Sequence, residues 1–236
     1  MTDIHCHVLF DIDDGSDSLE TSVQMCRDAY RNGCDAIVLT PHFFDFTTLD
    51  RFISERDRKI EILREDENIP LQLYAGAEIF LSDKIFSADS LDGLTVNGSR
   101  YILCELPLGP FDTRHVTMWI DELLDRGYVP ILAHPERYYE FHHDYELIDE
   151  LIDREILFQV NIDSLTGRNG EKPQGMGLDM ICRGLAVLMA SDAHDTTYRH
   201  TRLVEKFELF PDDITEEIVD FCMTENPEKI IKNQKI

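Results

Sequence analysis

The chain has 236 residues, with 22 basic against 47 acidic side chains and a formal net charge of −25 at pH 7. Its length suits one sizeable core, so we expect residues 1–236 to form a single domain. A strongly acidic surface repels phosphate backbones and anionic lipid, which disfavours nucleic acid and membrane surfaces as partners. The uninterrupted apolar runs, such as 185–190, are strand-sized, so we expect no membrane insertion.

Strands and helices alternate along the chain. Apolar runs predict strands over 3–7, 36–40, 71–80, 101–106, 129–133, 157–162 and 186–190. Helical spacing and capping residues predict helices over 18–32, 49–64, 115–126, 145–154 and 177–183. Two further helices are expected at the end, the last capped by Asn226 with Pro227 at its first position. Repeated strand–helix units predict a parallel sheet in an α/β fold.

The six cysteines show no close pair and no regular spacing. This usage is typical of reduced, mostly buried thiols, and we expect a cytoplasmic protein. Asp3 and His5 lie where the apolar part of a secretory signal would begin, so we expect no such signal. Cys6 and Cys104 adjoin candidate metal ligands, but neighbours on a strand point to opposite faces. Both are therefore predicted to pack in the core.

Side chains that bind metals end or directly follow most of the apolar runs. They are His5, His7, Asp14, His42, Glu78, Glu105, His134, Asp192 and His194. The carboxyl ends of parallel strands meet at one rim, so these side chains should converge there. Because ligands follow nearly every strand, a closed barrel is favoured over an open sheet, which gathers its site at one switch point. So many converging ligands predict a cluster of metal ions.

Two histidine-containing pairs support each other. On a strand, His5 and His7 point to one face, and Asp192 with His194 repeats that spacing on the last strand. Closure of a barrel would place these strands side by side. Taken alone, the first pair would be better interpreted as two surface histidines on an edge strand.

The remaining ligands also have competing readings. His42 and His134 could be hydrogen-bonded core histidines, whereas a buried Glu78 or Glu105 is costly unless it is paired. Asp14 is preferred among its acidic neighbours because it precedes Gly15. We expect the other histidines to lie on the surface, namely His115, His142, His143 and His200.

Several motifs together carry a family resemblance. They are Asp3-Ile4-His5-Cys6-His7, Asp13-Asp14-Gly15, Thr40-Pro41-His42, Gly76-Ala77-Glu78-Ile79, Cys104-Glu105-Leu106-Pro107, Ala133-His134-Pro135-Glu136-Arg137-Tyr138, Gln159-Val160-Asn161 and Ser191-Asp192-Ala193-His194. The set resembles the PHP (polymerase and histidinol phosphatase) superfamily. Within it, the chain is similar to the bacterial manganese-dependent protein-tyrosine phosphatases encoded with capsular and exopolysaccharide genes.

The resemblance implies a distorted (β/α)7 TIM-like barrel holding three divalent ions. Manganese is favoured, and iron or zinc would also suit these donors. By position, one ion would take His5, His7, Glu78 and Asp192. A second would take Glu78, Glu105 and His134, and the third Asp14, His42 and His194. Arg137 and Arg199 would face the substrate phosphate, although Arg199 precedes His200 where the subgroup usually has proline.

The expected activity is hydrolysis of phosphotyrosine on a bacterial tyrosine kinase that regulates capsular or exopolysaccharide synthesis. Clustered divalent ions generate a hydroxide nucleophile near neutral pH. No cysteine has arginine six positions on, as cysteine-based phosphatases require, and no GxSxG or P-loop motif is present. The alternatives are a small-molecule phosphomonoesterase of the histidinol phosphatase kind and a non-catalytic PHP scaffold. A nuclease role is the weakest reading, given the charge.

Overall fold

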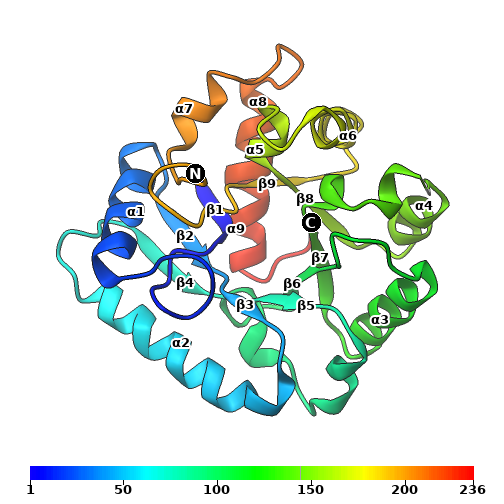
Figure 1. Ribbon diagram of the computed structural model, residues 1–236, viewed down its shortest axis with the longest axis horizontal. Coiled ribbons are helices and arrows are strands. Elements are labelled where there is room, and N and C mark those ends of the chain that lie inside the picture. Colours follow the sequence, from blue (N-terminus) through cyan, green and yellow to red (C-terminus); the bar gives the residue numbers. More distant parts are fainter. Residues whose placement is uncertain (144) are drawn as a thin grey trace.

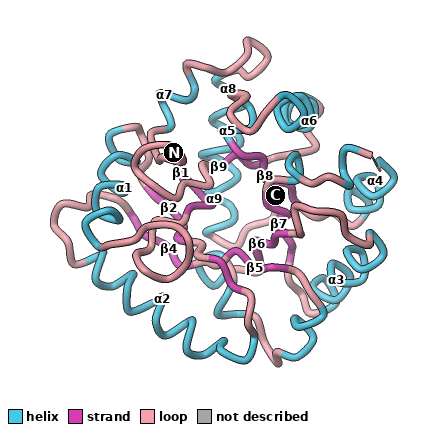
Figure 2. The backbone as a smooth tube through the Cα atoms, in the orientation of Figure 1, coloured by secondary structure: helices cyan, strands magenta, loops and turns pink. Residues whose placement is uncertain are grey.

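The computed structural model describes residues 1–143 and 145–236. The strands are β1 Thr2–Cys6, β2 Ala36–Leu39, β3 His42–Phe43, β4 Gln72–Ala75, β5 Glu78–Phe80, β6 Tyr101–Glu105, β7 Val129–Ala133, β8 Leu157–Asn161 and β9 Leu188–Ala190. The helices are α1 Leu19–Arg31, α2 Leu49–Arg64, α3 Thr113–Asp125, α4 Tyr145–Asp153, α5 Ile162–Leu165, α6 Glu171–Cys182, α7 Leu203–Phe207, α8 Glu216–Asp220 and α9 Asn226–Ile231. Helices α1, α2, α3, α4, α6 and α7 follow one another around the strands in chain order, and the short α5 lies between α6 and α7 (Figure 1). Figure 2 shows strands in the middle and most helices outside. Among the described residues, no helix combines the length and the apolar character needed to cross a membrane.

The strands form two parallel sheets, so the predicted parallel α/β fold is confirmed. One sheet has the order β1-β2-β4, and the other has the order β3-β5-β6-β7-β8-β9. The chain passes from the first sheet to the second twice, between β2 and β3 and between β4 and β5, and the two crossings are neighbours. Hydrogen bonds continue across the gap, from Gly76 N to Leu39 O and from Glu78 N to Pro41 O. The single strand expected over 71–80 is therefore wrong, since it breaks at Gly76, where a Cβ would lie 2.9 Å from Val38 Cγ1.

The first strand also lies beside the chain segment that follows the last strand. His7 N donates to Ala193 O over 2.8 Å, and Asp192 N donates to His5 O over 2.9 Å. The buried Asp3 carboxylate accepts from Ser191 N at 3.0 Å and from Ser191 Oγ at 2.5 Å. These bonds bring the two ends of the predicted metal-ligand set to one place.

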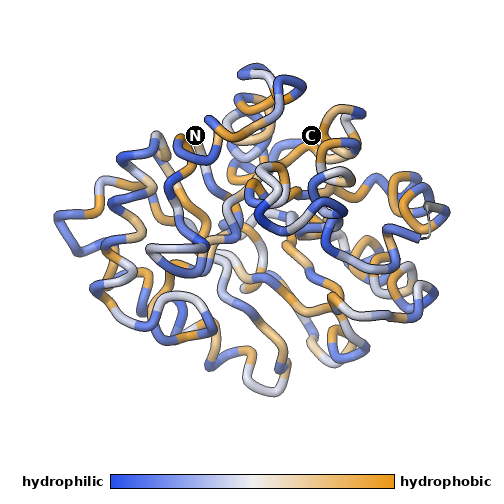
Figure 3. The backbone as a smooth tube through the Cα atoms, turned by 45° about the horizontal axis from the view of Figure 1, so that its top comes forward, coloured by the Kyte–Doolittle hydropathy of each residue, from blue (hydrophilic) through white to orange (hydrophobic). Residues whose placement is uncertain are grey.

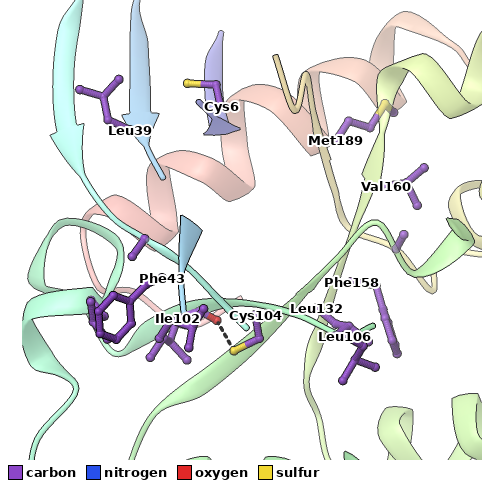
Figure 4. Close-up of a cluster of buried hydrophobic side chains, with 14 of the residues drawn as sticks. Cys6, Leu39, Phe43, Ile102, Cys104, Leu106, Leu132, Phe158, Val160 and Met189 are labelled. Atoms are coloured by element: carbon purple, nitrogen blue, oxygen red, sulfur yellow. Dashed lines mark hydrogen bonds between the residues drawn. The ribbon is translucent and has the colours of Figure 1, made fainter. Parts of the chain in front are cut away.

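Apolar residues alternate along the strands between two clusters. Ile102 and Cys104 belong to the larger cluster, which Figure 4 shows in part, while Leu103 belongs to the smaller one. This alternation turns Glu105 to the same side as Leu103. Cys6 and Cys104 are fully buried in the larger cluster, as predicted, and Cys182 alone among the cysteines is exposed. Figure 3 shows the apolar stretches running along the central strands and polar ones along many outer loops.

Two helix predictions are wrong. Helix α6 begins at Glu171, six residues before the expected start at Gly177. Gly177 instead lies inside this helix, where a Cβ would come within 3.1 Å of Val160 Cγ1, so glycine permits close packing on β8.

Asn226 does not cap the last helix. Helices α8 and α9 are joined by a π-helical turn, Phe221–Glu225, and the backbone is helical at Asn226 itself. The wider turn accommodates Pro227, which lacks an N–H for the usual bond. The Asn226 side chain instead donates to Val187 O over 3.0 Å.

Candidate metal centre

All nine predicted ligand residues come together where the strands end. Their donor atoms form overlapping groups in which every atom lies within 4.8 Å of the others. The groups are His7 with Asp14, His42 and His194; His5 with Glu78 and His134; His5 with His7 and Asp192; and His42 with Glu78 and Glu105. Strands β1, β3, β5 and β6 carry ligands directly, while β7 and β9 present theirs from the residues that follow.

Glu78 lies at the centre of this arrangement. Its Oε2 atom is 3.1 Å from His5 Nε2, 3.2 Å from His7 Nε2 and 3.1 Å from His42 Nδ1. Its other oxygen, Oε1, is 2.9 Å from His134 Nε2. Burial would raise the pKa of this fully buried carboxyl, but the charge of His5 and hydrogen bonds from the imidazoles hold the pKa well below its ordinary value. A carboxylate shared by four imidazoles has the position of a bridge between ions.

The outer part of the cluster is formed by Asp14, His42 and His194. Asp14 Oδ1 is 3.5 Å from His42 Nε2 and 3.4 Å from His194 Nε2, although the Asp14 side chain is 69% exposed. Glu105 Oε1 lies 3.1 Å from His42 Nδ1. Glu105 thus groups with His42 and Glu78, whereas the resemblance implied that it shares an ion with His134.

The donor set fits divalent metal ions. His194 Nε2 is buried and has no hydrogen-bond partner, while the buried His42 Nδ1 and Glu78 Oε2 face one another and other residues of the cluster. Such atoms are costly to bury unless something satisfies them, and metal ions would do so. Mixed imidazole and carboxylate donors suit manganese, iron and zinc.

Two residues orient the imidazoles of His5 and His7, and neither was predicted to have a role. Gln159 Oε1 lies 2.7 Å from His5 Nδ1, and Asp13 Oδ2 lies 2.7 Å from His7 Nδ1. Each contact leaves Nε2 free to bind metal, which is the usual arrangement behind metal-binding histidines. Asp13 also accepts from the backbone N of His42. The sequence hint to Gln159 is that it alternates with Asn161, so both polar side chains lie on one face of a strand that ends at the same rim.

The imidazoles and carboxylates shift one another's pKa values. Burial alone would lower the pKa of His7, but hydrogen bonds to Asp13 and Glu78 outweigh it and raise the pKa to about 9. Glu105 and Glu78 overcome burial in the same way and raise the pKa of His42 to about 11. Burial and the charge of His7 lower the pKa of His194 to about 3. Protons on His7 and His42 therefore balance part of the carboxylate charge.

Two arginines lie beside the cluster. Arg199 Nη2 is 2.8 Å from Asp192 Oδ1, and Arg137 Nη1 is 3.2 Å from Asp192 Oδ2. Both guanidinium groups remain partly exposed. They line a pocket of about 220 Å³ together with Asn161, Asp163, Asn169, Ser191, Asp192 and Tyr198. A pocket with two fixed cations next to a metal site is suited to a phosphoryl group.

Two of the ligands adopt a backbone conformation that is rare outside glycine. His134 has φ +38° and Asp192 has φ +50°, both in the left-handed region, the first directly after β7 and the second two residues after β9. Conformations of this kind cost free energy and concentrate at functional sites. They turn the chain sharply at the points where these ligands enter the cluster.

The prediction that His200 lies on the surface is wrong. Its side chain is buried, with Nδ1 accepting from Arg202 N at 3.2 Å. Burial, followed by the nearby Lys206 and Arg202 charges, lowers its pKa to about 4, so the ring is neutral. His142 is half-buried, with Nε2 2.9 Å from Glu136 O. His115 and His143 are exposed, as predicted.

A family model for capsular polysaccharide synthesis, CpsB/CapC, matches residues 1–232. The chain belongs to the CpsB/CapC family. One member, tyrosine-protein phosphatase YwqE of Bacillus subtilis, is 30% identical, and the match covers 100% of this chain and 93% of YwqE. Another, tyrosine-protein phosphatase CpsB of Streptococcus pneumoniae, is 29% identical with full coverage of both chains.

Solved structures extend the comparison beyond the CpsB/CapC sequences. A crystal structure from work on YwqE and CpsB, described as unique metal-dependent tyrosine phosphatases, matches with a TM-score of 0.86 at 30% identity. It is covered to 96%, and this chain to 100%. A phosphotriesterase homology protein from Escherichia coli matches with a TM-score of 0.61 at 12% identity, covering 98% of each chain. That second likeness concerns the fold alone.

Proposed function

We propose that this CpsB/CapC chain is a metal-dependent tyrosine-protein phosphatase. The observation that carries the proposal is the position of Asp192, which faces the histidine cluster while both its oxygens contact arginines. The proposed metal cluster and the proposed phosphate pocket thus share one residue. Full-length relatives that are named tyrosine-protein phosphatases support the same activity.

We also propose that the strands close into a distorted (β/α)7 barrel. Support comes from the bonds of His5 and His7 to the segment after β9, and from the bonds that continue across the break at Gly76. If β2 with β3 and β4 with β5 each count as one bent strand, the strands would make a ring of about seven, as alternating strand–helix units allow.

The cluster would hold three divalent ions, with manganese favoured. Glu78 would be shared between ions because its two oxygens face different imidazoles. One ion would be held by an inner group of ligands and another by an outer group. The third would be held by Glu78 with Glu105 and His134. The proposed inner ligands are His5, His7 and Asp192, and the proposed outer ligands are Asp14, His42 and His194.

When bound, divalent ions supply Lewis-acid charge and an activated water at neutral pH. The protein supplies orientation and charge for the phosphoryl group. Arg137 and Arg199 would bind its oxygens and neutralise the charge that develops during transfer. Gln159 and Asp13 keep the β1 imidazoles in the correct orientation. Cys6 and Cys104 are unsuited as nucleophiles, because burial raises the pKa of both thiols.

The test compares substrates with purified, manganese-loaded protein. Turnover of a phosphotyrosine peptide should exceed turnover of histidinol phosphate by kcat/KM. The reverse preference would favour a small-molecule phosphomonoesterase. Absence of turnover for both, in protein shown by elemental analysis to be loaded, would leave a non-catalytic scaffold as the better account.

The physiological substrate is proposed to be a tyrosine kinase of capsular or exopolysaccharide synthesis. The capsule-synthesis description of the matching family supports this choice. Dephosphorylation of an autophosphorylated kinase of that class, followed with a phosphotyrosine antibody, tests it. The cytoplasmic location expected from the cysteines stays a prediction.

A further inference from the structure

Tyr198 stands at the edge of the phosphate pocket and is 64% exposed. The loop that carries it is nonetheless firmly held. The Asp195 carboxylate accepts from the backbone N of Thr197 and of Tyr198, each at 2.6 Å, and from Arg199 N at 3.2 Å. Arg199 O accepts from His194 N at 2.7 Å and from Asp195 N at 3.1 Å. The tyrosine is therefore presented by an ordered loop between a proposed metal ligand and a proposed phosphate ligand.

Arg168 supports this loop from behind. Its Nη1 donates to Tyr198 O over 2.9 Å, and its guanidinium carbon lies 5.9 Å from the centre of the Tyr198 ring. Arg168 is placed in turn by Asp163, whose Oδ1 lies 4.0 Å from Arg168 Nε and 2.9 Å from Nζ of the buried Lys206. Contacts through Asp163 thus connect the support of Tyr198 to helices α5 and α7.

We propose that the Tyr198 ring, supported by Arg168, packs against the phenyl ring of the substrate. This inference rests on the proposed phosphatase function and names a determinant of its specificity. A phenyl ring joined to a phosphoryl group lies directly beside it, so a ring whose phosphate contacts Arg137 and Arg199 would lie at the mouth of the same pocket. Aromatic pairs prefer ring centres about 4.5–7 Å apart, which suits a side chain on the pocket edge.

A surface tyrosine without function is the competing account, because isolated exposed apolar side chains are common on proteins. The two accounts differ in ligand selectivity. If Tyr198 determines specificity, its substitution should weaken the binding of ligands that carry a ring and leave the binding of other ligands unchanged. If its role is only structural, its substitution should weaken the binding of both kinds equally, through Arg199, or of neither.

The test measures equilibrium binding of two probes to the manganese-loaded protein by calorimetry. Phenylphosphonate carries a ring directly on phosphorus, and inorganic phosphate carries none. Tyr198→Ala should weaken phenylphosphonate binding about 3- to 10-fold, as expected for one aromatic pair, and change phosphate binding less than about 2-fold. Tyr198→Phe should bind both probes like the wild type. Arg168→Gln should weaken phenylphosphonate binding in the same direction but less.

Tyr30→Ala is the matched control, since Tyr30 is 48% exposed on α1 and does not line the pocket. It should leave both affinities unchanged. Equal weakening of both probes by Tyr198→Ala, or weakening of neither, would overturn the proposal. Failure of the wild type to turn over a phosphotyrosine peptide would instead overturn the proposed function, so the two failures are distinguishable.

Discussion

Asn161 donates a hydrogen bond from Nδ2 to Asp192 Oδ2 over 2.7 Å, joining the end of β8 to the proposed metal site. Gln159 Nε2 donates to Asn161 Oδ1 over 2.9 Å, while Gln159 Oε1 lies against His5. A continuous line of side chains therefore runs from His5 through β8 to Asp192. Both ends of this line are proposed ligands of the same ion.

Asn161→Ala should lower kcat/KM on a phosphotyrosine peptide by about 10- to 100-fold, as is typical when a partner of a metal ligand is removed. The reason is that Asp192 would lose the group that fixes its orientation. Asn169→Ala is the control, because Asn169 lines the same pocket but donates to Ser164 Oγ instead. Equal losses in the two variants would contradict a role through Asp192.

Prolonged chelation should abolish phosphatase activity, and manganese should restore it best. The cysteines offer no alternative nucleophile, since they are mostly buried and none has arginine six positions on. Activity and elemental content should be measured on the same samples. Full activity in protein proved free of metal would show that the cluster does not carry the reaction.

Glu78→Gln should lose more bound metal than Asp14→Asn. Glu78 is buried and contacts four imidazoles, whereas Asp14 is largely exposed and contacts two. His143→Ala removes an exposed imidazole and should retain full metal content. Metal per chain, measured by mass spectrometry after dialysis, decides the point, and equal content in Glu78→Gln and Asp14→Asn would refute the bridging assignment.

Arg137→Ala should keep its metal and its fold while losing activity by about 100-fold or more, the usual effect of removing one donor that stabilises transition-state charge. Arg137→Lys should recover only part of this loss, because an ammonium group cannot replace a bidentate fork. Arg199→Ala should behave similarly. Activity near that of the wild type in Arg137→Ala would make its contact with Asp192 a structural ion pair only.

The metal-free protein should become less stable as pH rises from 7 to 9. The pKa of His7 is raised in the folded chain to about 9 and that of His42 to about 11, from an ordinary value of 6.5. A raised pKa stabilises the fold fully below the unfolded value, and the contribution is lost as pH rises through the folded value. Metal binding must displace these protons, so manganese affinity should instead rise with pH.

Thermal unfolding at pH 7, 8 and 9 checks both expected trends, in the stability of the metal-free protein and in the affinity for manganese. The Tm of chelated protein should fall across this range, while the increase in Tm produced by a fixed manganese concentration should grow. A chelated Tm that is independent of pH would mean that the two imidazoles are not held protonated by the carboxylates.

The sequence was enough to predict that the candidate ligands come together, because their placement depends on the direction of the strands. Parallel strands present their carboxyl ends at one rim, so His42 and Glu105 could be assigned to a common site without knowledge of their packing. Asp13 and Gln159 could not be given roles, because an orienting hydrogen bond depends on distances between strands. The buried position of His200 was missed for the same reason, since it depends on how the segment before α7 packs.

The break in the strand over 71–80 left no signal in hydrophobic periodicity. The run stays apolar through Gly76 and Ala77, and only the close approach to Val38 forces the chain to cross there. The π-helical turn was missed because Asn226-Pro227 has the composition of a helix start. Its continuation of the preceding helix depends on tertiary contacts such as the bond to Val187.

The hydrogen bond from Asp192 N to His5 O joins residues near opposite ends of the chain. During synthesis, His5 is therefore made long before the partners that complete its surroundings. A polypeptide that stops just before Asp192 already contains helices α1 to α6 but lacks part of the proposed ligand set. The complete set of proposed ligands therefore exists only after residue 194 has been made, and products that terminate before it should lack metal-dependent activity however well their early segments fold.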